Sequence, residues 1–392
     1  MTGGSELNAT HVEELLGPTR AIPPDAEEEP RDGVALCLSG GGYRAMLFHA
    51  GVLRRLNDAA WLTKLDRISS VSGGSIAAAT LALHWNELGL ERSDVSPNFV
   101  DEVEAPLREL ARHNVDVPSV LTGLALPFIS RADRVASAYR KHLFGDSQLS
   151  ALPARPRFII NATNVGSGAL ARFTRDYLAD WRVGRIMGPE IDLAVAVACS
   201  SAFPPVLSPY RLDLRDAEWQ TERGNDLIGN EHRDEMVLTD GGVYDNLGLE
   251  TAWKQCRTVL VSDAGGKMAA DADPKGDPAR HMLRVVKVID NQVRALRKRQ
   301  VIAGYKSGTR DGAYVGIRSD IDNYEAPNAL PASQEQTLLL AEVPTRLAAV
   351  DDVLQERLIN WGYAVCDAGL RRWVEPELEA PPAFPYPQAG VG

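Results

Sequence analysis

The segment "RISSVSGGSIAAAT", residues 67–80, contains the side chain best suited to act as a nucleophile. A strand-like run ends at Ser72, and Gly73 and Gly74 then lead into small residues that predict a helix. This pattern is typical of a nucleophile elbow, in which a sharp strand-to-helix turn exposes a serine hydroxyl. Ser70 stands where that motif has its first glycine. A serine that only caps the following helix is the structural alternative.

Three glycines, Gly40, Gly41 and Gly42, separate the first predicted strand from a predicted helix. Such a loop leaves backbone N–H groups free to face an anion. Gly40, Gly42 and Ala45 also satisfy the dinucleotide-binding pattern G-x-G-x-x-A. That fold needs an acidic residue at the end of its second strand, where Ser72 stands here. The sequence therefore disfavours a nucleotide site, and we expect no cofactor.

Two aspartates could accept the proton of a serine. Asp240 ends a strand-like run and precedes Gly241 and Gly242, and Asp263 ends a second such run before glycines. The carboxyl ends of parallel strands share one edge of a sheet, so either carboxylate could face Ser72. An Asx turn is the structural alternative for an Asp-Gly pair. We prefer Asp240 as the base and keep Asp263 as its rival.

The histidines offer only weak candidates for a base. His232 and His281 could complete a Ser-His-Asp triad, but neither follows an obvious strand in a loop. His49 lies in the predicted helix after the glycine loop, where core packing is the expected role. A basic cluster is typical of a solvated helix face, with a lipid-headgroup contact as the minority interpretation; its members are Arg294, Arg297, Lys298 and Arg299.

The elements that must position these residues alternate between strand and helix, which predicts an α/β fold with a largely parallel sheet. We expect a loosely ordered extension over residues 1–32, one domain over 33–375 and a proline-rich tail over 376–392. Strands are predicted at 34–39, 66–72, 157–165, 236–242 and 257–266, and helices at 43–59, 73–85, 192–203 and 335–360.

Composition limits the possible partners. The formal net charge of -11 disfavours nucleic acid and electrostatic recruitment to an anionic membrane, but leaves hydrophobic attachment open. The N-terminal residues lack the basic and apolar regions of a signal peptide, so we expect a cytoplasmic protein, unless a specialised system exports it. Four scattered cysteines predict reduced thiols and no metal site: Cys37, Cys199, Cys256 and Cys366.

In this order, "SGGGYRA", "SVSGG" and "TDGG" resemble the motifs of patatin-like phospholipases and, less closely, the catalytic domain of cytosolic phospholipases. The segment "ACSSAFPPVLSP" (198–209) also resembles the family, and the likeness covers roughly residues 33–265. Ser70 and Ala45 each stand where the family has a glycine. The resemblance implies a three-layer α/β/α patatin-like fold with a Ser-Asp dyad. Its implied site residues are Ser72 as nucleophile, Asp240 as base, Gly40, Gly41 and Gly42 as the oxyanion hole, and Arg44 as the basic residue that supports the loop or meets a headgroup.

The activity that the resemblance implies is hydrolysis of fatty-acyl esters of phospholipids or lysophospholipids through an acyl-serine intermediate. The implied partner is a lipid substrate, with transient contact to a membrane surface. A Ser-His-Asp esterase or thioesterase for small soluble esters and a catalytically silent scaffold remain alternatives. We expect the apolar segment 119–130 to line or cover the acyl pocket, with burial in the core as its alternative.

Overall fold

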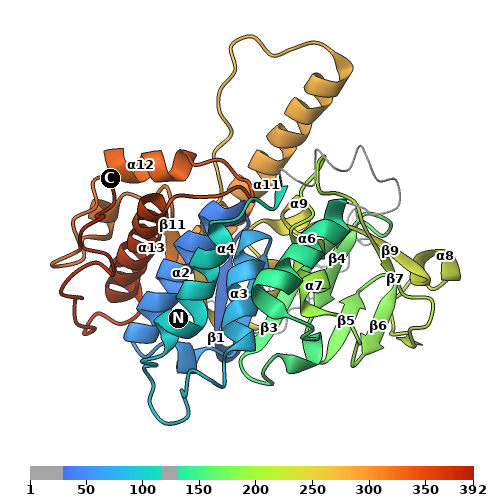
Figure 1. The fold of residues 1–392 in the computed structure, drawn as a ribbon, viewed down its shortest axis with the longest axis horizontal. Coiled ribbons are helices and arrows are strands. Elements are labelled where there is room, and N and C mark those ends of the chain that lie inside the picture. The colour runs from blue at the N-terminus through green and yellow to red at the C-terminus, as the bar shows by residue number, and fades with distance from the viewer. Residues whose placement is uncertain (1–29, 117–130) are drawn as a thin grey trace, which may run out of the picture.

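The computed structural model describes residues 30–116 and 131–392. The predicted extension therefore lies almost wholly outside the described residues, and so does the apolar segment 119–130. The first strand begins at Arg31. Within the described part of the chain the strands form a single 11-stranded sheet with helices packed on both faces (Figure 1).

The centre of the sheet is parallel, in the order β11-β10-β1-β2-β3. These strands are β1 (Arg31–Leu38), β2 (Arg67–Val71), β3 (Arg157–Asn164), β10 (Cys256–Asp263) and β11 (Tyr314–Gly316). Their apolar runs are buried, as expected for parallel strands covered by helices on both faces. The predicted α/β fold class is confirmed.

Beyond β3 the sheet becomes antiparallel, continuing through β4, β5, β6 and β8, while β9 pairs with β3 and β7. Of the strands in this half, the sequence predicted only β9, as the strand at 236–242, and missed the others. Its strands are β4 (Ala169–Phe173), β5 (Tyr177–Asp180), β6 (Gly184–Met187), β7 (Tyr210–Asp213), β8 (Trp219–Gln220) and β9 (Glu235–Asp240).

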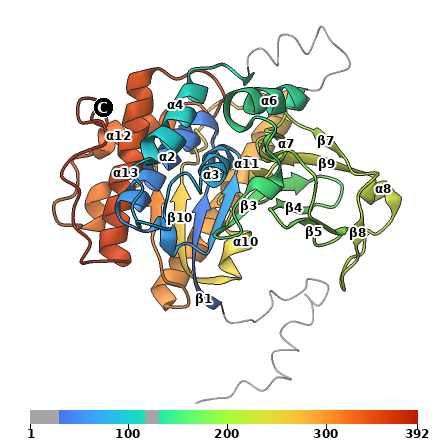
Figure 2. The same cartoon turned by 60° about the horizontal axis from the view of Figure 1, so that its bottom comes forward.

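Side chains of the central strands alternate between two cores, because successive residues of a strand point to opposite faces. Leu36 and Leu38 join the larger core, which packs under the helices α2 (Gly42–Asp58), α3 (Gly73–Leu83) and α13 (Asp352–Trp373). Ala35 and Cys37 join a smaller core on the other face, under α10 (Glu250–Trp253) and α11 (Pro278–Ser307). The arrangement is a three-layer α/β/α sandwich, which the turned view shows from the side (Figure 2).

The helices differ in length from 4 to 30 residues. They are α2 (Gly42–Asp58), α3 (Gly73–Leu83), α4 (Ala105–Ala111), α6 (Arg131–Tyr139), α7 (Leu193–Ser200), α8 (Asn230–Arg233), α9 (Gly242–Asp245), α10 (Glu250–Trp253), α11 (Pro278–Ser307), α12 (Gln334–Glu342) and α13 (Asp352–Trp373). Short 3-10 or π turns occupy Leu62–Lys64, Val100–Glu104, Arg140–Phe144, Leu149–Ala151 and Ile321–Tyr324. No helix in the described ranges is long and apolar enough to cross a membrane.

Two predictions at the C-terminal end need adjustment. The single helix predicted over 335–360 is wrong: α12 ends at Glu342, Pro344 follows, and Asp351 caps the start of α13 with its side chain. Residues 376–392 contain no helix or strand, but they pack against the domain. The Asn360 amide donates to the carbonyls of Tyr386 and Gly390, at 2.8 and 2.7 Å.

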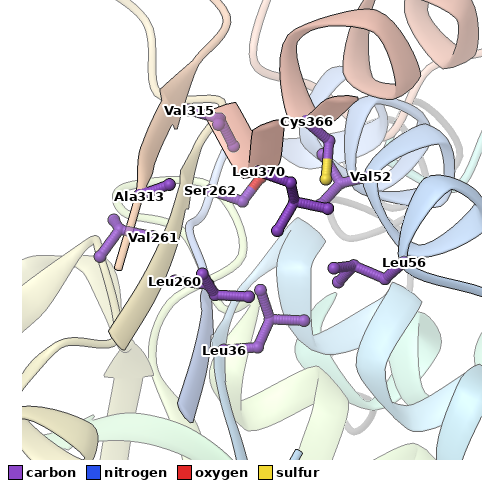
Figure 3. Close-up of a pocket in the computed structure, with 10 residues that line it drawn as sticks. All are labelled: Leu36, Val52, Leu56, Leu260, Val261, Ser262, Ala313, Val315, Cys366 and Leu370. Atoms are coloured by element: carbon purple, nitrogen blue, oxygen red, sulfur yellow. The ribbon is translucent and has the colours of Figure 1, made fainter. Parts of the chain in front are cut away.

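A small apolar cavity lies in the larger core, between α2, α13 and strands β10 and β11 (Figure 3). Its lining residues are Leu36, Val52, Leu56, Leu260, Val261, Ser262, Ala313, Val315, Cys366 and Leu370. None of the predicted site residues lines it. The cavity is a gap in core packing and does not mark the substrate site.

Candidate active site

Ser72 stands at a strained turn between β2 and α3. Its φ of 51° and ψ of -121° lie outside the regions that residues with a Cβ normally adopt. The turn is also tightly packed, because a Cβ at Gly73 would lie 2.2 Å from the Gly42 carbonyl oxygen, and one at Gly74 would lie 2.4 Å from the Leu38 carbonyl oxygen. The local geometry is that of a nucleophile elbow.

Ser70 fits the position where the elbow motif has a glycine. It lies in β2, is buried, and its hydroxyl donates to the Ile159 carbonyl at 3.2 Å. It also accepts a hydrogen bond from the Ser75 hydroxyl at 3.0 Å. Its polar atom is therefore satisfied inside the sheet, and the departure from the motif leaves the turn at Ser72 intact.

β2 and β9 lie end to end along one edge of β3. β4 pairs with residues 160–164 of β3 and occupies the other edge. β2 pairs in parallel along residues 157–161, and β9 pairs antiparallel along residues 162–164. A strand has only two edges for pairing, so β2 and β9 share one, and their last residues approach each other.

This junction places Ser72 beside Asp240. Val71, the last residue of β2, pairs with Asn161, and Asp240, the last residue of β9, pairs with the next residue, Ala162. We predicted this proximity from parallel strands that end at a common edge of the sheet. That reasoning was wrong, because β9 is antiparallel to β3 and reaches the junction from the opposite side.

Asp240 is buried, with 2% of its surface exposed. Its Oδ1 accepts a hydrogen bond from the Gly242 N–H at 2.7 Å. Its Oδ2 forms no hydrogen bond of ordinary geometry within the described residues, so the nearby Ser72 hydroxyl is a longer polar contact. Burial raises the pKa of Asp240 to about 7, and the Gly242 N–H and the Ser72 hydroxyl oppose this rise. A carboxylate with this pKa is a stronger base than a solvated one.

The glycine loop lies against the elbow. Gly41 and Gly42 have φ values of 147° and 61°, which favour glycine. A Cβ on Gly40 would lie 3.1 Å from the Cβ of Ser72. The Gly40 N–H donates to the Asn246 carbonyl at 3.1 Å, so this predicted oxyanion donor is already engaged. Gly41 and Gly42 begin α2, where N–H groups have no partner within the helix.

Arg44 is buried behind this loop, with 3% of its surface exposed. Its Nε and Nη2 donate to the Ala264 carbonyl at 3.2 and 3.0 Å, and its Nη1 donates to the Val343 carbonyl. Burial, together with the Arg294 charge, lowers the pKa of Arg44 to about 10. The guanidinium thus connects the segment after β10 to the segment after α12, next to the glycine loop.

The rival base and the histidines have other partners. Asp263 accepts hydrogen bonds from the Tyr314 hydroxyl at 2.6 Å and the Gly265 N–H at 2.8 Å. His49 is buried between the Ser262 hydroxyl and the Ser39 carbonyl, and burial lowers its pKa to about 4. His232 lies in α8 and His281 near the start of α11; neither hydrogen-bonds Ser72 or Asp240 in the described structure.

Ser200 is a site residue that the sequence did not single out. Its hydroxyl accepts a hydrogen bond from the Ser72 N–H at 2.9 Å and donates to the Asn161 carbonyl at 2.7 Å. It therefore fixes the backbone of the elbow to β3. The available signal was the pair of serines that ends the apolar run 193–199.

Apolar side chains border this junction. The N–H groups of Asp240 and Gly241 donate to the carbonyls of Ala202 and Ser200, which ties the segment after α7 to the Asp240 turn. The next residue of that segment, Phe203, is 52% exposed. Val243, three residues after Asp240, is 48% exposed.

The described residues contain no group of three or more His, Cys, Asp or Glu side chains that could hold a metal ion. The four cysteines are buried and free. The chemistry that these residues support is acyl transfer to a serine.

Comparison with known proteins adds a family. The profile of the patatin-like phospholipase family matches residues 36–253. No curated protein matches the sequence. Among solved structures, human GIVD cytosolic phospholipase A2 in complex with methyl gamma-linolenyl fluorophosphonate aligns at 15% identity over 91% of this chain, with a TM-score of 0.49. This chain spans only 60% of the length of that protein.

Two bacterial proteins align with lower scores. VipD from Legionella pneumophila aligns at 14% identity over 87% of this chain and 67% of its own, with a TM-score of 0.37. The type III effector protein ExoU aligns at 14% identity over 88% of this chain and 54% of its own, with a TM-score of 0.32. The family match covers more than half of the 392 residues, and on that ground the chain belongs to the patatin-like phospholipase family, a family of lipid ester hydrolases.

Proposed function

We propose that this protein cleaves fatty-acyl ester bonds of phospholipids or lysophospholipids with Ser72 as nucleophile and Asp240 as base. One observation carries the proposal: the buried Asp240 carboxylate, with a pKa raised to about 7, lies beside a serine held in an elbow. An ordinary exposed aspartate would be ionised but too weakly basic to assist a hydroxyl. Burial brings the pKa of this carboxyl close to neutral pH.

In the first half of the reaction, Asp240 takes the Ser72 proton as the serine Oγ attacks the ester carbonyl carbon. The carbonyl oxygen becomes an oxyanion, which the N–H groups of Gly41 and Gly42 stabilise at the start of α2. The intermediate then collapses, the bond to the alcohol oxygen breaks, and Asp240 returns the proton to that oxygen. The products are an acyl-serine and the deacylated lipid.

In the second half, a water molecule takes the place of the alcohol. Asp240 accepts a proton from this water as its oxygen attacks the acyl carbon, and the same N–H groups stabilise the second oxyanion. The Ser72 oxygen leaves with the proton held by Asp240, and the fatty acid is released. One carboxylate thus serves both halves, and no histidine is required.

A lipid rather than a small soluble ester is favoured by the family and by the apolar border of the site. Phe203 and Val243 leave large apolar surfaces in water beside the Asp240 turn. Apolar side chains on the segments that adjoin the Asp240 turn support an apolar substrate. We expect a preference for long acyl chains.

A fluorophosphonate probe followed by lipid product analysis tests the proposal. The probe should label the wild-type protein and fail to label folded Ser72→Ala. Ser70→Ala, which removes a neighbouring hydroxyl, is the control and should still react with the probe. Incubation with a mixed phospholipid extract should release free fatty acids, measured by mass spectrometry. Labelling without lipid turnover but with turnover of butyrate esters would favour the small-ester esterase, and no labelling would favour the scaffold.

A further inference from the structure

One helix carries an unusual share of the exposed apolar surface. Seven of the 18 large apolar side chains that are exposed in the described ranges lie on α11, between residues 282 and 296. They are Met282, Leu283, Val285, Val286, Val288, Ile289 and Leu296. Scattered single residues of this kind are ordinary, but a contiguous set marks an interaction surface.

The two halves of α11 have different surroundings. The C-terminal half packs under the sheet, where Val301 is fully buried and the Tyr305 hydroxyl donates to the Val259 carbonyl at 2.5 Å. The N-terminal half projects from the body of the molecule (Figure 1), and most of its side chains are exposed. Asp277 caps this free end by accepting a hydrogen bond from the Arg280 N–H at 3.1 Å. Among the residues that the structure describes, the projecting half is thus a regular helix with most of its side chains uncovered.

The spacing of the apolar residues makes the projecting half amphipathic. Met282, Val285, Val286 and Ile289 recur at intervals of three and four residues and form one stripe. The basic residues of the same stretch are Arg280, Arg284 and Lys287. Each stands two positions from a member of the stripe. Two positions correspond to about 200° around a helix, so these residues lie on the opposite face.

α11 is basic, whereas the chain as a whole is acidic. The helix holds eight Lys and Arg residues and one acidic residue, Asp290, in a chain of net charge -11. A second copy of this chain is a poor partner for the stripe, because pairing would bring two such basic helices together. An anionic lipid surface satisfies both features, since it accepts the apolar stripe and attracts the basic face.

The anchored part of α11 connects the projection to the site. Arg297 donates to Glu250 of α10 at 2.6 Å, and Arg294 donates to the Gly266 carbonyl. α11 also packs against α9, the short helix that directly follows the Asp240 turn and carries the exposed Val243. The projecting helix and the apolar border of the site therefore belong to adjoining elements.

We propose that the N-terminal half of α11 is an interfacial helix that docks the protein on anionic phospholipid bilayers, with its apolar stripe in the acyl boundary and its basic residues among the headgroups. This inference deepens the proposed function and rests on it for the choice of a lipid surface as partner. The net charge predicted no electrostatic recruitment to such a surface. The distribution of charge along the fold reverses that expectation for this helix.

The test measures binding of the full chain to vesicles by co-sedimentation, in a Ser72→Ala background so that the vesicles stay intact. The vesicles consist of phosphatidylcholine with a minority of phosphatidylglycerol, and pure phosphatidylcholine vesicles serve for comparison. An apolar variant combines Met282→Gln, Val286→Gln and Ile289→Gln. A charge variant combines Arg280→Gln, Arg284→Gln and Lys287→Gln.

A matched control variant removes three exposed apolar side chains from other elements, by Ile228→Gln, Leu339→Gln and Val353→Gln. The control should bind anionic vesicles as the parent does. The charge variant should bind roughly a hundredfold more weakly, because each basic residue near an anionic surface contributes about fivefold to partitioning. The apolar variant should lose more than about tenfold, on pure phosphatidylcholine as well.

Turnover separates this inference from the proposed function. With Ser72 restored, both α11 variants should hydrolyse a soluble butyrate ester at the parental rate and vesicle phospholipid more slowly. If the proposed function fails, vesicle binding by Ser72→Ala still tests the helix. Absence of binding, binding that neither variant reduces, or a stripe-dependent dimer in place of binding would each overturn the inference.

Discussion

Ser72 directly follows β2 and Asp240 ends β9, and these two strands run toward each other along one edge of β3 and stop at neighbouring pairing positions, Asn161 and Ala162. The site is thus built at a junction between a parallel and an antiparallel strand. The positions of the Ser72 hydroxyl and the Asp240 carboxylate therefore depend on how β2 and β9 pair with β3. The turns after both strands need glycine, at Gly73 and Gly241, because a Cβ there would meet backbone atoms.

Asp240→Asn should stabilise the fold at alkaline pH. Burial raises the pKa of Asp240 to about 7, so the folded protein holds a proton that the unfolded chain has lost. The free energy of unfolding therefore falls as pH rises from about 4 to 7, and the penalty is complete above pH 7. Asparagine carries no such penalty, so the melting temperature of the variant should exceed that of the wild type by several degrees at pH 8. The gain should shrink toward pH 5; a gain independent of pH would contradict a buried, ionising carboxyl.

Ser200→Ala should lower kcat with little change in KM. The substitution removes the acceptor of the Ser72 N–H and leaves that donor buried, which costs about 1–3 kcal/mol in the positioning of the elbow. We expect a fall in kcat of roughly tenfold to a hundredfold, with partial rescue in Ser200→Thr. Ser201→Ala is the control, because that neighbouring hydroxyl contacts Val197 and Tyr139 instead. Equal losses of kcat in Ser200→Ala and Ser201→Ala would show that Ser200 contributes packing only and does not position the elbow.

Gly73→Ala should inactivate the protein without unfolding it. The added Cβ would lie 2.2 Å from the Gly42 carbonyl oxygen and must displace the glycine loop from the elbow. Loss of aligned oxyanion donors costs on the order of 10²–10³ in kcat. Gly276→Ala, where a Cβ meets nothing within 4 Å, serves as the control and should retain full turnover of a p-nitrophenyl ester. An active Gly73→Ala protein would show that the position of the glycine loop is not needed for catalysis.

Arg44→Lys should reduce hydrolysis of a neutral soluble ester and of a phospholipid by the same factor. An ammonium group cannot reproduce the guanidinium contacts to the Ala264 and Val343 carbonyls, so the loop above it loses support. The melting temperature should fall with both activities. A loss confined to phospholipid would instead show that Arg44 contacts the headgroup.

The sequence predicted local features of the site better than their arrangement. The elbow at Ser72, the glycine loop and the aspartate turn are encoded by residues close together in the chain, and each was located. The direction of β9 depends on pairing with β3, more than 70 residues away, and no local pattern specifies it. For the same reason the sequence did not predict the role of Ser200, since its partners are Ser72, which follows β2, and Asn161 of β3.

The interfacial helix shows the same limit. The basic cluster of α11 was evident from the sequence, but the exposure of the apolar residues before it was not predicted. Only the fold shows that Val301 is buried while Met282 and Ile289 are exposed, because the helix extends beyond the sheet that covers its other half. Amphipathic spacing predicts a helix, and tertiary structure decides what its apolar face meets.

The most direct test of the dyad is the kcat of folded variants on a p-nitrophenyl ester. Asp240→Asn keeps the size of the side chain but removes the base, so kcat should fall by roughly 10²–10⁴. His232→Ala, His281→Ala and His49→Gln should keep most activity, and wild-type kcat/KM should rise with pH to a plateau above about 7, as the Asp240 carboxyl ionises. An inactive, folded His232→Ala or His281→Ala protein would contradict the dyad in favour of a triad, and an active Asp240→Asn beside an inactive Asp263→Asn would move the base to Asp263.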